Sequence, residues 1–426
     1  FGYIGIFCLN LICIFENDYK NTKIIKLEQN YRSTKTILNA ANSVIKNNKE
    51  RKEKKLWSNN QKGEKIKYLR CYDEKHEVDT VIQKIKKSTT SYSDIAVFYR
   101  TNAQSRVIEE GFLKENIPYK IVGSYYFYNR KEIKDLIAYL KLIYNPEDGL
   151  SLARAINTPK RGIGAKSMQK LVDISNAKNI SIFEAITEGP EFEFKKMIIN
   201  LIEKTESLTL TELIEEILID SGIRKFLEKE KTLENDIRLE NLEEFKSITQ
   251  SFEERNGEVS LEEFLESIAL VSDVKEYKET DDAVNLMTLH SAKGLEFDVV
   301  FILGMEENLF PHINSIDKKE DLEEERRLCY VGITRAKKRL YILNAKRRRL
   351  YGKEMVNSPS RFIDEIDEEL IESNRLVQKK INKNKMYIDE KNNDLKPGDK
   401  VIHKQYGEGV VISVEQSLAT IAFSHK

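Results

Sequence analysis

The segment Val284–Gly304, VNLMTLHSAKGLEFDVVFILG, decides the fold class of this chain. Two apolar runs, Ala283–Met287 and Val299–Leu303, are short and rich in branched residues. Continuous apolar runs of this length predict strands buried on both faces, as in a parallel sheet covered by helices. The polar loop that joins the two runs carries Thr288, His290, Lys293 and Glu296.

The same alternation of strand and helix patterns lies on both sides of this segment. The further strands that we expect are Ile24–Leu27, Ile66–Cys71, Asp94–Tyr99, Tyr119–Val122 and Arg339–Leu343. The helices that we expect are Ser33–Lys46, Val78–Ile85, Ala103–Lys114 and about Asp321–Ile333. The pattern predicts an α/β fold with short, mostly parallel strands.

The middle of the chain, from about Arg130 to Glu279, has few strand signals. Segments such as RKEIKDLIAYLKLIYN and LTELIEEILIDSGI place apolar residues three or four apart, which is typical of amphipathic helices. We therefore expect a large all-helical domain, residues 126–279, inserted into an α/β domain made of residues 16–125 and 280–366.

The end of the chain is different again. The Lys- and Asn-rich residues 367–395 predict a flexible linker. Residues 396–426 have turn signals, Pro397–Asp399 and Gly407–Gly409, between short alternating runs, which predict a small β-barrel that stops abruptly at Lys426.

Composition limits the function classes. Among 426 residues, 70 Lys and Arg balance 70 Asp and Glu, so a nucleic-acid surface has to be a local stripe.

The apolar run Phe1–Phe15 lacks preceding basic residues and is interrupted by glycines, which argues against a signal peptide or a membrane span. It also lacks an initiator methionine, so we expect a truncated or out-of-frame start over residues 1–15. The four cysteines, Cys8, Cys13, Cys71 and Cys329, have no metal spacing, and this predicts a reducing, cytoplasmic location and no metal site.

The segment PKRGIGAKSMQKL resembles a phosphate-binding P-loop only superficially. A P-loop needs glycines where this chain has Lys160 and Ala165, and it follows a strand. A tight turn through Gly162 and Gly164 fits better. With Lys160, Arg161 and Lys166 beside it, the turn could hold a nucleic-acid phosphate or be a plain helix–helix turn with solvated lysines.

Another segment, KLEQNYRSTKTILNAAN, runs from the expected strand Ile24–Leu27 into a helix. It places Tyr31 and Arg32 at the carboxyl-terminal edge of the strand, where ligands bind in open α/β sheets. Tyrosine can stack on a base there while arginine meets a phosphate. The loop residue His290 is equally compatible with a structural role.

Five segments in order resemble the second half of superfamily 1 DNA helicases of the UvrD/PcrA/Rep group, with the PcrA branch most similar. They are LEQNYRST, VFYRTNAQSR, PKRGIG, MTLHSAKGLEFDVVFILGMEENLFPH and EEERRLCYVGITRAKKRLYI. The resemblance covers about Phe15–Ile366 and implies a RecA-like α/β domain, a helical insertion that contacts duplex DNA, and a Tudor-like terminal barrel.

The resemblance also implies roles for individual residues. Arg335 and Arg32 would reach the γ-phosphate of ATP, Tyr31 would stack on adenine, and Glu296 would contact the ribose. The residues implied to touch single-stranded DNA are Arg100, Asn102, Thr288 and His290. The turn Gly162, Ile163 and Gly164, flanked by Lys160 and Arg161, would clamp the duplex.

Departures from the family pattern qualify the activity. The sequence has no Gly-x-x-x-x-Gly-Lys-Ser/Thr and no family-type Asp-Glu strand end, so we expect the Mg²⁺ ligands on a missing N-terminal helicase domain. The first hypothesis is the C-terminal half of an ATP-dependent 3′-5′ helicase of DNA repair or replication, inactive alone. The alternative is a non-catalytic DNA-binding or interaction module from a decayed or split helicase. The barrel would be a site for RNA polymerase, and no membrane partner is expected.

Two further clusters have two interpretations each. The aromatic cluster Tyr125–Tyr128 predicts core packing, with base stacking as the alternative. The basic run Lys346–Arg349 predicts a solvated strand end, with phosphate contact as the alternative.

Overall fold

The computed structural model describes residues 28–49, 56–257, 259–273, 281–373, 400–403, 407–415 and 418–423. The chain divides into two compact units, Phe1–Arg375 and Leu376–Lys426. The expected strand Ile24–Leu27, the start over residues 1–15 and most of the expected linker lie outside the described residues. Within the described parts of the chain, we find no helix that combines the length and apolar character needed to cross a membrane.

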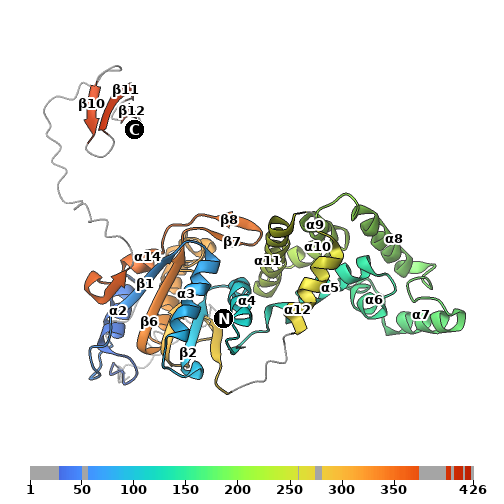
Figure 1. Ribbon diagram of the computed structural model, residues 1–426, viewed down its shortest axis with the longest axis horizontal. Coiled ribbons are helices and arrows are strands. Elements are labelled where there is room, and N and C mark those ends of the chain that lie inside the picture. Colours follow the sequence, from blue (N-terminus) through green and yellow to red (C-terminus); the bar gives the residue numbers. More distant parts are fainter. Residues whose placement is uncertain are drawn as a thin grey trace, which may run out of the picture. The chain divides into compact units, whose positions relative to one another are not determined.

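The first unit contains a seven-stranded sheet with the order β3-β4-β2-β5-β6-β1-β9 (Figure 1). Every neighbouring pair in it is parallel. The strands are β1 (Ile66–Cys71), β2 (Ile95–Tyr99), β3 (Tyr119–Ile121), β4 (Val284–Thr288), β5 (Phe297–Ile302), β6 (Ala336–Ala345) and β9 (Ile371–Ser373). Since all of β2 is buried, the expectation of centrally placed apolar strands holds.

Helices cover both faces of this sheet. One core joins the strands to α2 (Lys35–Ile45), α13 (Lys319–Ile333) and α14 (Arg361–Asp364). The other joins them to α3 (Glu74–Lys86) and α4 (Ser105–Lys114). These layers make an α/β fold, as the sequence predicts, and short 3₁₀ turns η1 (Tyr92–Asp94), η2 (Asn102–Gln104) and η5 (Ile313–Ser315) connect its elements.

Between β3 and β4 the described elements are helical. They are η3 (Phe127–Asn129), α5 (Lys131–Tyr144), α6 (Gly149–Ala155), α7 (Ala165–Lys178), α8 (Gly189–Lys204), α9 (Leu210–Asp220), α10 (Ile223–Lys229), α11 (Leu233–Asn256) and α12 (Leu261–Asp273). Figure 1 shows them grouped beside the sheet. They share an apolar core of their own, in which Tyr139, Phe194, Phe245 and Phe264 are fully buried.

Two elements differ from the expectation. A hairpin of β7 (Arg348–Leu350) and β8 (Lys353–Met355) follows β6, and the sequence did not predict it. The expected linker from residue 367 is wrong at its start, because η6 (Glu368–Leu370) and β9 add an edge strand that pairs with β1. Leu370 is buried in the sheet core, which explains why this acidic segment is ordered.

The second unit contains a three-stranded antiparallel sheet, in the order β10-β11-β12. Its strands are β10 (Lys400–His403), β11 (Gly407–Glu415) and β12 (Leu418–Phe423). These strands fit the alternating pattern of residues 396–426, and a Tudor-like barrel stays a prediction.

Candidate functional site: two edges of one sheet

Arg32, Glu296 and Arg335 meet at the amino-terminal ends of two neighbouring strands. Glu296 directly precedes β5 and Arg335 directly precedes β6, and the two strands are paired from their first residues. The Arg32 Nε donates to the Glu296 carboxylate, and Arg32 Nη1 donates to the Thr334 carbonyl at 3.4 Å. Residues far apart in the sequence thus form one cationic cluster, which we call the Arg32–Arg335 cluster.

The turn before α2 positions Arg32. The Asn30 side-chain oxygen accepts from the amides of Arg32 at 2.8 Å and Ser33 at 2.9 Å, so it closes a local turn. The Ser33 hydroxyl then donates to the Ala336 carbonyl at 2.6 Å, at the first residue of β6. This bond, between groups that are both buried, fixes Arg32 beside the start of that strand.

The strand Ile24–Leu27, whose carboxyl-terminal edge we expected to carry Tyr31 and Arg32, lies outside the described residues. The general rule for open α/β sheets points to carboxyl-terminal strand ends, but Glu296 and Arg335 lie at amino-terminal ends. Glu296 and Arg335 lie at this edge because each is the last residue of the turn that leads into its strand, β5 or β6.

Charge in the cluster is unevenly balanced. Its hydrogen bond with Arg32 lowers the pKa of Glu296, and Lys337 lies 3.4 Å from the same carboxylate. Burial and the positive charge of Arg32 lower the pKa of Arg335. Arg32 and Lys337 pair with this one carboxylate and Arg335 adds a third positive charge, so the cluster keeps a positive excess that suits a phosphate.

Arg335 is held by neutral groups. Its Nε donates to the Val331 carbonyl at 3.1 Å and its Nη1 to the Leu295 carbonyl at 3.2 Å. Backbone carbonyls orient the guanidinium without cancelling its charge. Tyr31 is next to Arg32 in sequence and is 78% exposed, so its ring is accessible for stacking.

The opposite, carboxyl-terminal edge carries the residues expected to touch single-stranded DNA. Arg100 follows β2, Thr288 ends β4, and His290 follows in the next turn. The Arg100 guanidinium binds Glu325 of α13 through Nε at 2.9 Å and Nη2 at 2.6 Å. Desolvation and the charge of Arg100 lower the pKa of His290 to about 4, so the ring is neutral at neutral pH although its surface is exposed.

Asn102 does not present its side-chain oxygen at this edge. That oxygen is buried and has no hydrogen-bond partner among the described residues, while the Asn102 carbonyl accepts from Arg130 at 3.1 Å. Thr288 shares a 3.0 Å hydrogen bond with Ser291. Arg100, Thr288 and His290 are therefore the more accessible members of the predicted set.

The expected DNA clamp forms a turn before α7. Gly162 has a φ of 79° and Ile163 is buried, which anchors the turn in the helical core. Arg161 turns inward: its guanidinium donates to the carbonyls of Ser221 at 2.7 Å and Thr158 at 3.0 Å. Lys160, Gly162 and Gly164 are exposed, so these residues could still contact a phosphate. The Arg161 guanidinium is instead bound to the protein's own backbone.

The aromatic cluster before α5 divides into two pairs. Phe127 and Tyr128 are buried, as core packing predicts, whereas Tyr125 and Tyr126 are exposed.

Within the described residues, no group of three or more His, Cys, Asp or Glu side chains could hold a metal ion. The free thiols of Cys71 and Cys329 are buried, while Cys8 and Cys13 lie outside the described residues.

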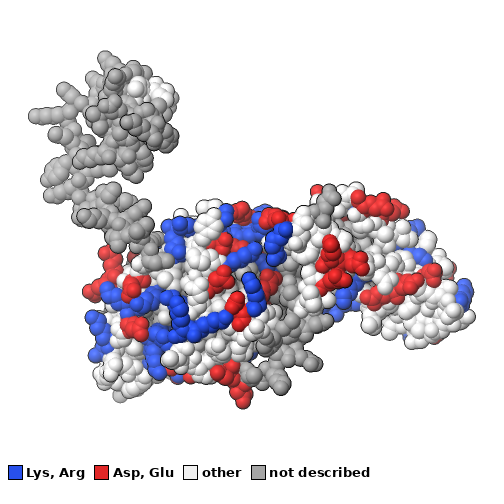
Figure 2. All heavy atoms as spheres, in the orientation of Figure 1, with Lys and Arg blue, Asp and Glu red and all other residues white. Residues whose placement is uncertain are grey.

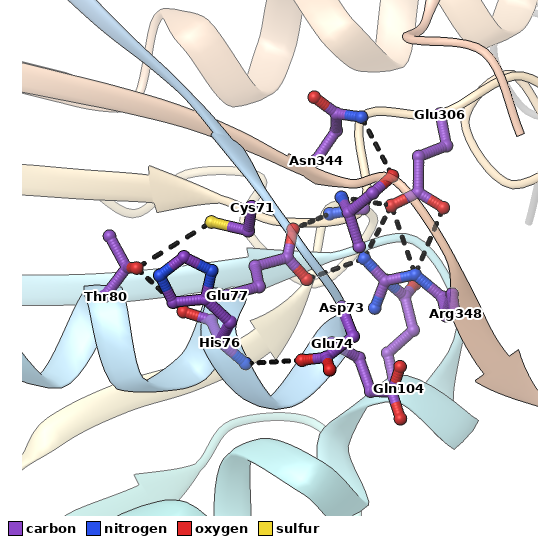
Figure 3. Close-up of polar contacts among 12 residues, drawn as sticks. Cys71, Asp73, Glu74, His76, Glu77, Thr80, Gln104, Glu306, Asn344 and Arg348 are labelled. Atoms are coloured by element: carbon purple, nitrogen blue, oxygen red, sulfur yellow. Dashed lines mark hydrogen bonds and ion pairs between the residues drawn. The ribbon is translucent and has the colours of Figure 1, made fainter. Parts of the chain in front are cut away.

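The basic run after β6 is a solvated strand end only in part, because Lys346 and Arg347 are exposed whereas Arg348 is buried. Arg348 is buried and its Nη2 lies 2.6 Å from both the Glu77 and the Glu306 carboxylates (Figure 3). Arg349 binds Glu254 at 2.7 Å. A strand turns alternate side chains inward, so a run of four cations can contain a buried one. A sequence signal existed: Glu77 lies on the apolar face of its helix, four residues before Val81.

The comparisons with known proteins agree with this geometry. A sequence profile described as the UvrD-like helicase C-terminal domain matches residues 25–347, which include β1 to β6 of the sheet and the helices between them. The chain belongs to the UvrD-like helicase C-terminal domain family. The predicted resemblance to the UvrD/PcrA/Rep group is thereby confirmed.

Relatives of this UvrD-like chain include two proteins described as ATP-dependent DNA helicase PcrA. The one from Staphylococcus epidermidis is 46% identical over 454 residues, and the one from Staphylococcus aureus is 45% identical over 456 residues. Each alignment covers 99% of this chain and 62% of the relative, so the chain spans less than two thirds of their length. A solved structure, the C-terminal domain of a possible DNA helicase from Lactobacillus, covers 81% of this chain and 98% of its own, with 11% identity and a TM-score of 0.33. A likeness that weak carries no argument.

Proposed function

We propose that this chain is the C-terminal half of an ATP-dependent 3′-5′ DNA helicase that couples ATP hydrolysis to movement along single-stranded DNA. The observation that carries the proposal is the Arg32–Arg335 cluster, in which Arg32 pairs with Glu296 while backbone carbonyls hold the Arg335 guanidinium beside it. Paired cations of this kind offset charge on the γ-phosphoryl oxygens during phosphoryl transfer, which can contribute about 10³ to 10⁵ in rate.

In this proposal the chain's own residues bind one side of a nucleotide. Tyr31 stacks on the adenine, Glu296 contacts the ribose, and Arg32 and Arg335 hold the terminal phosphate. Mg²⁺-ATP supplies the transferable phosphoryl group, and its metal ligands belong to the N-terminal helicase domain of the intact protein. Because Arg32 is engaged by Glu296 in this structure, phosphate binding has to compete with that ion pair.

DNA is gripped at the other edge of the same sheet. Arg100, Thr288 and His290 contact the single strand, and the helical residues 126–279 form an inserted domain whose Gly162–Gly164 turn holds the duplex. The RecA-like domain then comprises residues 16–125 and 280–373. Nucleotide and DNA lie at opposite ends of the parallel strands, so closure on ATP at one edge changes the grip at the other. The terminal strands β10–β12 belong to a Tudor-like barrel for a protein partner such as RNA polymerase.

Two measurements on the purified chain test the proposal. We expect single-stranded DNA to bind with an affinity that falls with salt, and we expect His290→Ala to weaken it. His290 is the cleaner choice, because removing Arg100 would leave the buried Glu325 carboxylate without its cation. We expect no ATP turnover by this chain alone. Absence of DNA binding would overturn the DNA role, and turnover abolished by Arg335→Ala would overturn the assignment of the catalytic metal site to another domain.

A non-catalytic DNA-binding module is the second candidate. It is favoured by one observation, the lack of any Gly-x-x-x-x-Gly-Lys-Ser/Thr in 426 residues. Both candidates predict DNA binding, but only the first predicts that ATP engages Arg32 and Arg335. If the chain binds DNA but ATP does not contact Arg32 and Arg335, the non-catalytic module is favoured.

A further inference from the structure

Tyr72, Lys346 and Arg347 form an exposed patch at the carboxyl-terminal edge of the sheet, which we call the Tyr72–Arg347 patch. Tyr72 follows β1, and Lys346 and Arg347 follow β6. The two chain segments stay paired beyond the strand ends, because the Lys346 amide donates to the Cys71 carbonyl at 3.0 Å and the Arg347 amide to the Tyr72 carbonyl at 3.2 Å. These backbone hydrogen bonds fix the positions from which the three side chains project.

The patch has a stacked cation at its centre. The Arg347 guanidinium lies 4.3 Å from the centroid of the Tyr72 ring. Tyr72 is 53% exposed and the Arg347 side chain 46% exposed, so each keeps an open face toward solvent. A planar guanidinium held against an aromatic ring is a surface on which an unpaired base can stack.

The charge of the patch is only weakly balanced. The nearest carboxylate to Arg347 is that of Glu354, at 3.7 Å, and that side chain is half-exposed. Lys346 is exposed and has no ion pair among the residues that the structure describes. Figure 2 shows Lys and Arg side chains gathered over the part of the molecule that carries the sheet. An exposed pair this long contributes little, so both cations are available for an anion.

The residue that follows the patch holds it in place. Arg348 is buried between Glu77 and Glu306, and the Ala345 amide also donates to Glu306 at 2.8 Å (Figure 3). Lys346 and Arg347 form the bend between β6 and β7, and the buried residues Ala345 and Arg348 anchor the bend on both sides. The backbone is thus ordered before any ligand binds, which reduces the entropy lost on binding.

We propose that the Tyr72–Arg347 patch is a further contact site for single-stranded DNA, in which a base stacks on Tyr72 and Arg347 and a phosphate binds Lys346. The proposal rests on the DNA role proposed above and extends it. The strands of the seven-stranded sheet are all parallel, so the patch shares an edge with Arg100 and Thr288. Strand spacing places β6 and β1 roughly 10 to 15 Å beyond β2, a span that a few nucleotides of extended strand cross. Duplex DNA keeps its bases stacked inside the helix and cannot use the platform.

Titration of a labelled oligothymidine with the purified chain, followed by fluorescence anisotropy, tests the patch. We expect Tyr72→Ala and Arg347→Ala each to weaken binding about five-fold or more, while Tyr72→Phe binds within about two-fold of the parent chain. Lys346→Ala should reduce the slope of affinity against salt by about 0.7, as one lost phosphate contact predicts. The matched control is Lys84→Ala with Lys87→Ala, at the far end of α3 and also exposed.

Each outcome is decisive. If Tyr72→Ala and Arg347→Ala bind like the parent chain while His290→Ala weakens binding, the patch proposal fails and the proposed function stands. If the parent chain binds no oligothymidine, the proposed DNA role itself fails. If Tyr72→Ala weakens binding to a blunt duplex as much as to the single strand, or if the control pair has the same effect as Arg347→Ala, base stacking at this patch is overturned. The replaced side chains are exposed, and circular dichroism confirms that each variant is folded.

Discussion

The Arg32 guanidinium donates to the carboxylate of Glu296, a residue 264 positions away in the chain, at the amino-terminal ends of β5 and β6. This ion pair connects the turn before α2 to the loop that decided the fold class. It also defines the resting state of the Arg32–Arg335 cluster, because a phosphate has to replace or share that carboxylate.

Neutralising Glu296 should strengthen anion binding at the cluster. We expect Glu296→Gln to bind tripolyphosphate about two- to five-fold more tightly than the parent chain, since a partly exposed ion pair is worth roughly 0.2–1 kcal/mol. Tripolyphosphate has no ribose, so a ribose contact of Glu296 does not affect the result. Isothermal titration measures the affinity, with Asp298→Asn as the matched control, because Asp298 on β5 pairs with exposed Lys338 on the neighbouring strand β6. Equal or weaker binding by Glu296→Gln would contradict this account of the cluster.

Removing Arg348 should destabilise the sheet strongly. The substitution Arg348→Met leaves Glu77 and Glu306 buried without a cation, which costs roughly 3–5 kcal/mol of unfolding free energy. The control Arg349→Met loses an ion pair with a largely exposed carboxylate, and we expect less than about 1 kcal/mol. Urea unfolding measures both variants. A loss in Arg348→Met no larger than in Arg349→Met would show that the buried pair is not needed for stability.

Glu109 should make stability depend on pH. Burial raises the pKa of this carboxyl from 4.5 to about 7. Between these values the folded chain binds more protons than the unfolded chain, so the free energy of unfolding falls as pH rises through the window. We expect the free energy of unfolding of the parent chain to fall by about 1–3 kcal/mol more than that of Glu109→Gln between about pH 5 and about pH 8.

Thermal or urea unfolding over that pH range, parent against variant, measures the effect of Glu109. The control is Glu115→Gln, which changes an exposed carboxyl whose pKa is lowered by its hydrogen bond with Lys86. Parallel pH profiles for the parent chain and Glu109→Gln would contradict a proton held on Glu109.

The turn before α7 offers a test that separates DNA contact from folding. A Cβ at Gly164 would meet no atom within 4 Å, and the residue has an extended φ of −99° at the amino-terminal cap of α7. Serine is a favoured cap, so Gly164→Ser should preserve or slightly raise stability. We expect it to weaken duplex binding several-fold, because the new side chain occupies the place of a backbone phosphate.

Two neighbours of Gly164 serve as contrasts. Lys160→Ala should lower duplex affinity without a change in unfolding, whereas Arg161→Ala should destabilise the helical core, since it removes several hydrogen bonds to backbone carbonyls. Filter binding and urea unfolding measure the two effects. Full duplex affinity in both Gly164→Ser and Lys160→Ala would remove the clamp proposal.

The sequence predicted the elements whose apolar residues repeat along the chain. The strand β2 is apolar throughout and β5 is apolar except for Asp298, and the helices between β3 and β4 show a clear three- and four-residue period. It did not predict β9, whose residues are Ile371, Glu372 and Ser373, because an edge strand needs only one apolar side chain and gains the rest from pairing with β1.

The candidate site was predicted residue by residue, but its geometry was not. Local sequence cannot show that Glu296 lies beside Arg32, since that contact depends on how β5 and β6 align. Nor can it show that Arg348 faces inward while Arg347 stacks on Tyr72, because Arg348 begins the β7–β8 hairpin and Arg347 pairs with the chain that follows β1. Long-range pairing decides which cation is buried and which is available.

The most direct test of the central claim is nuclear magnetic resonance of the arginine side-chain Nε groups during titration with ATP and, separately, with AMP. The account predicts that the Nε signals of Arg32 and Arg335 shift together with ATP and stay unchanged with AMP, and that Arg161, bound inside the helical core, does not respond. If neither arginine responds to ATP, or if AMP shifts them equally, the cluster does not meet a terminal phosphate.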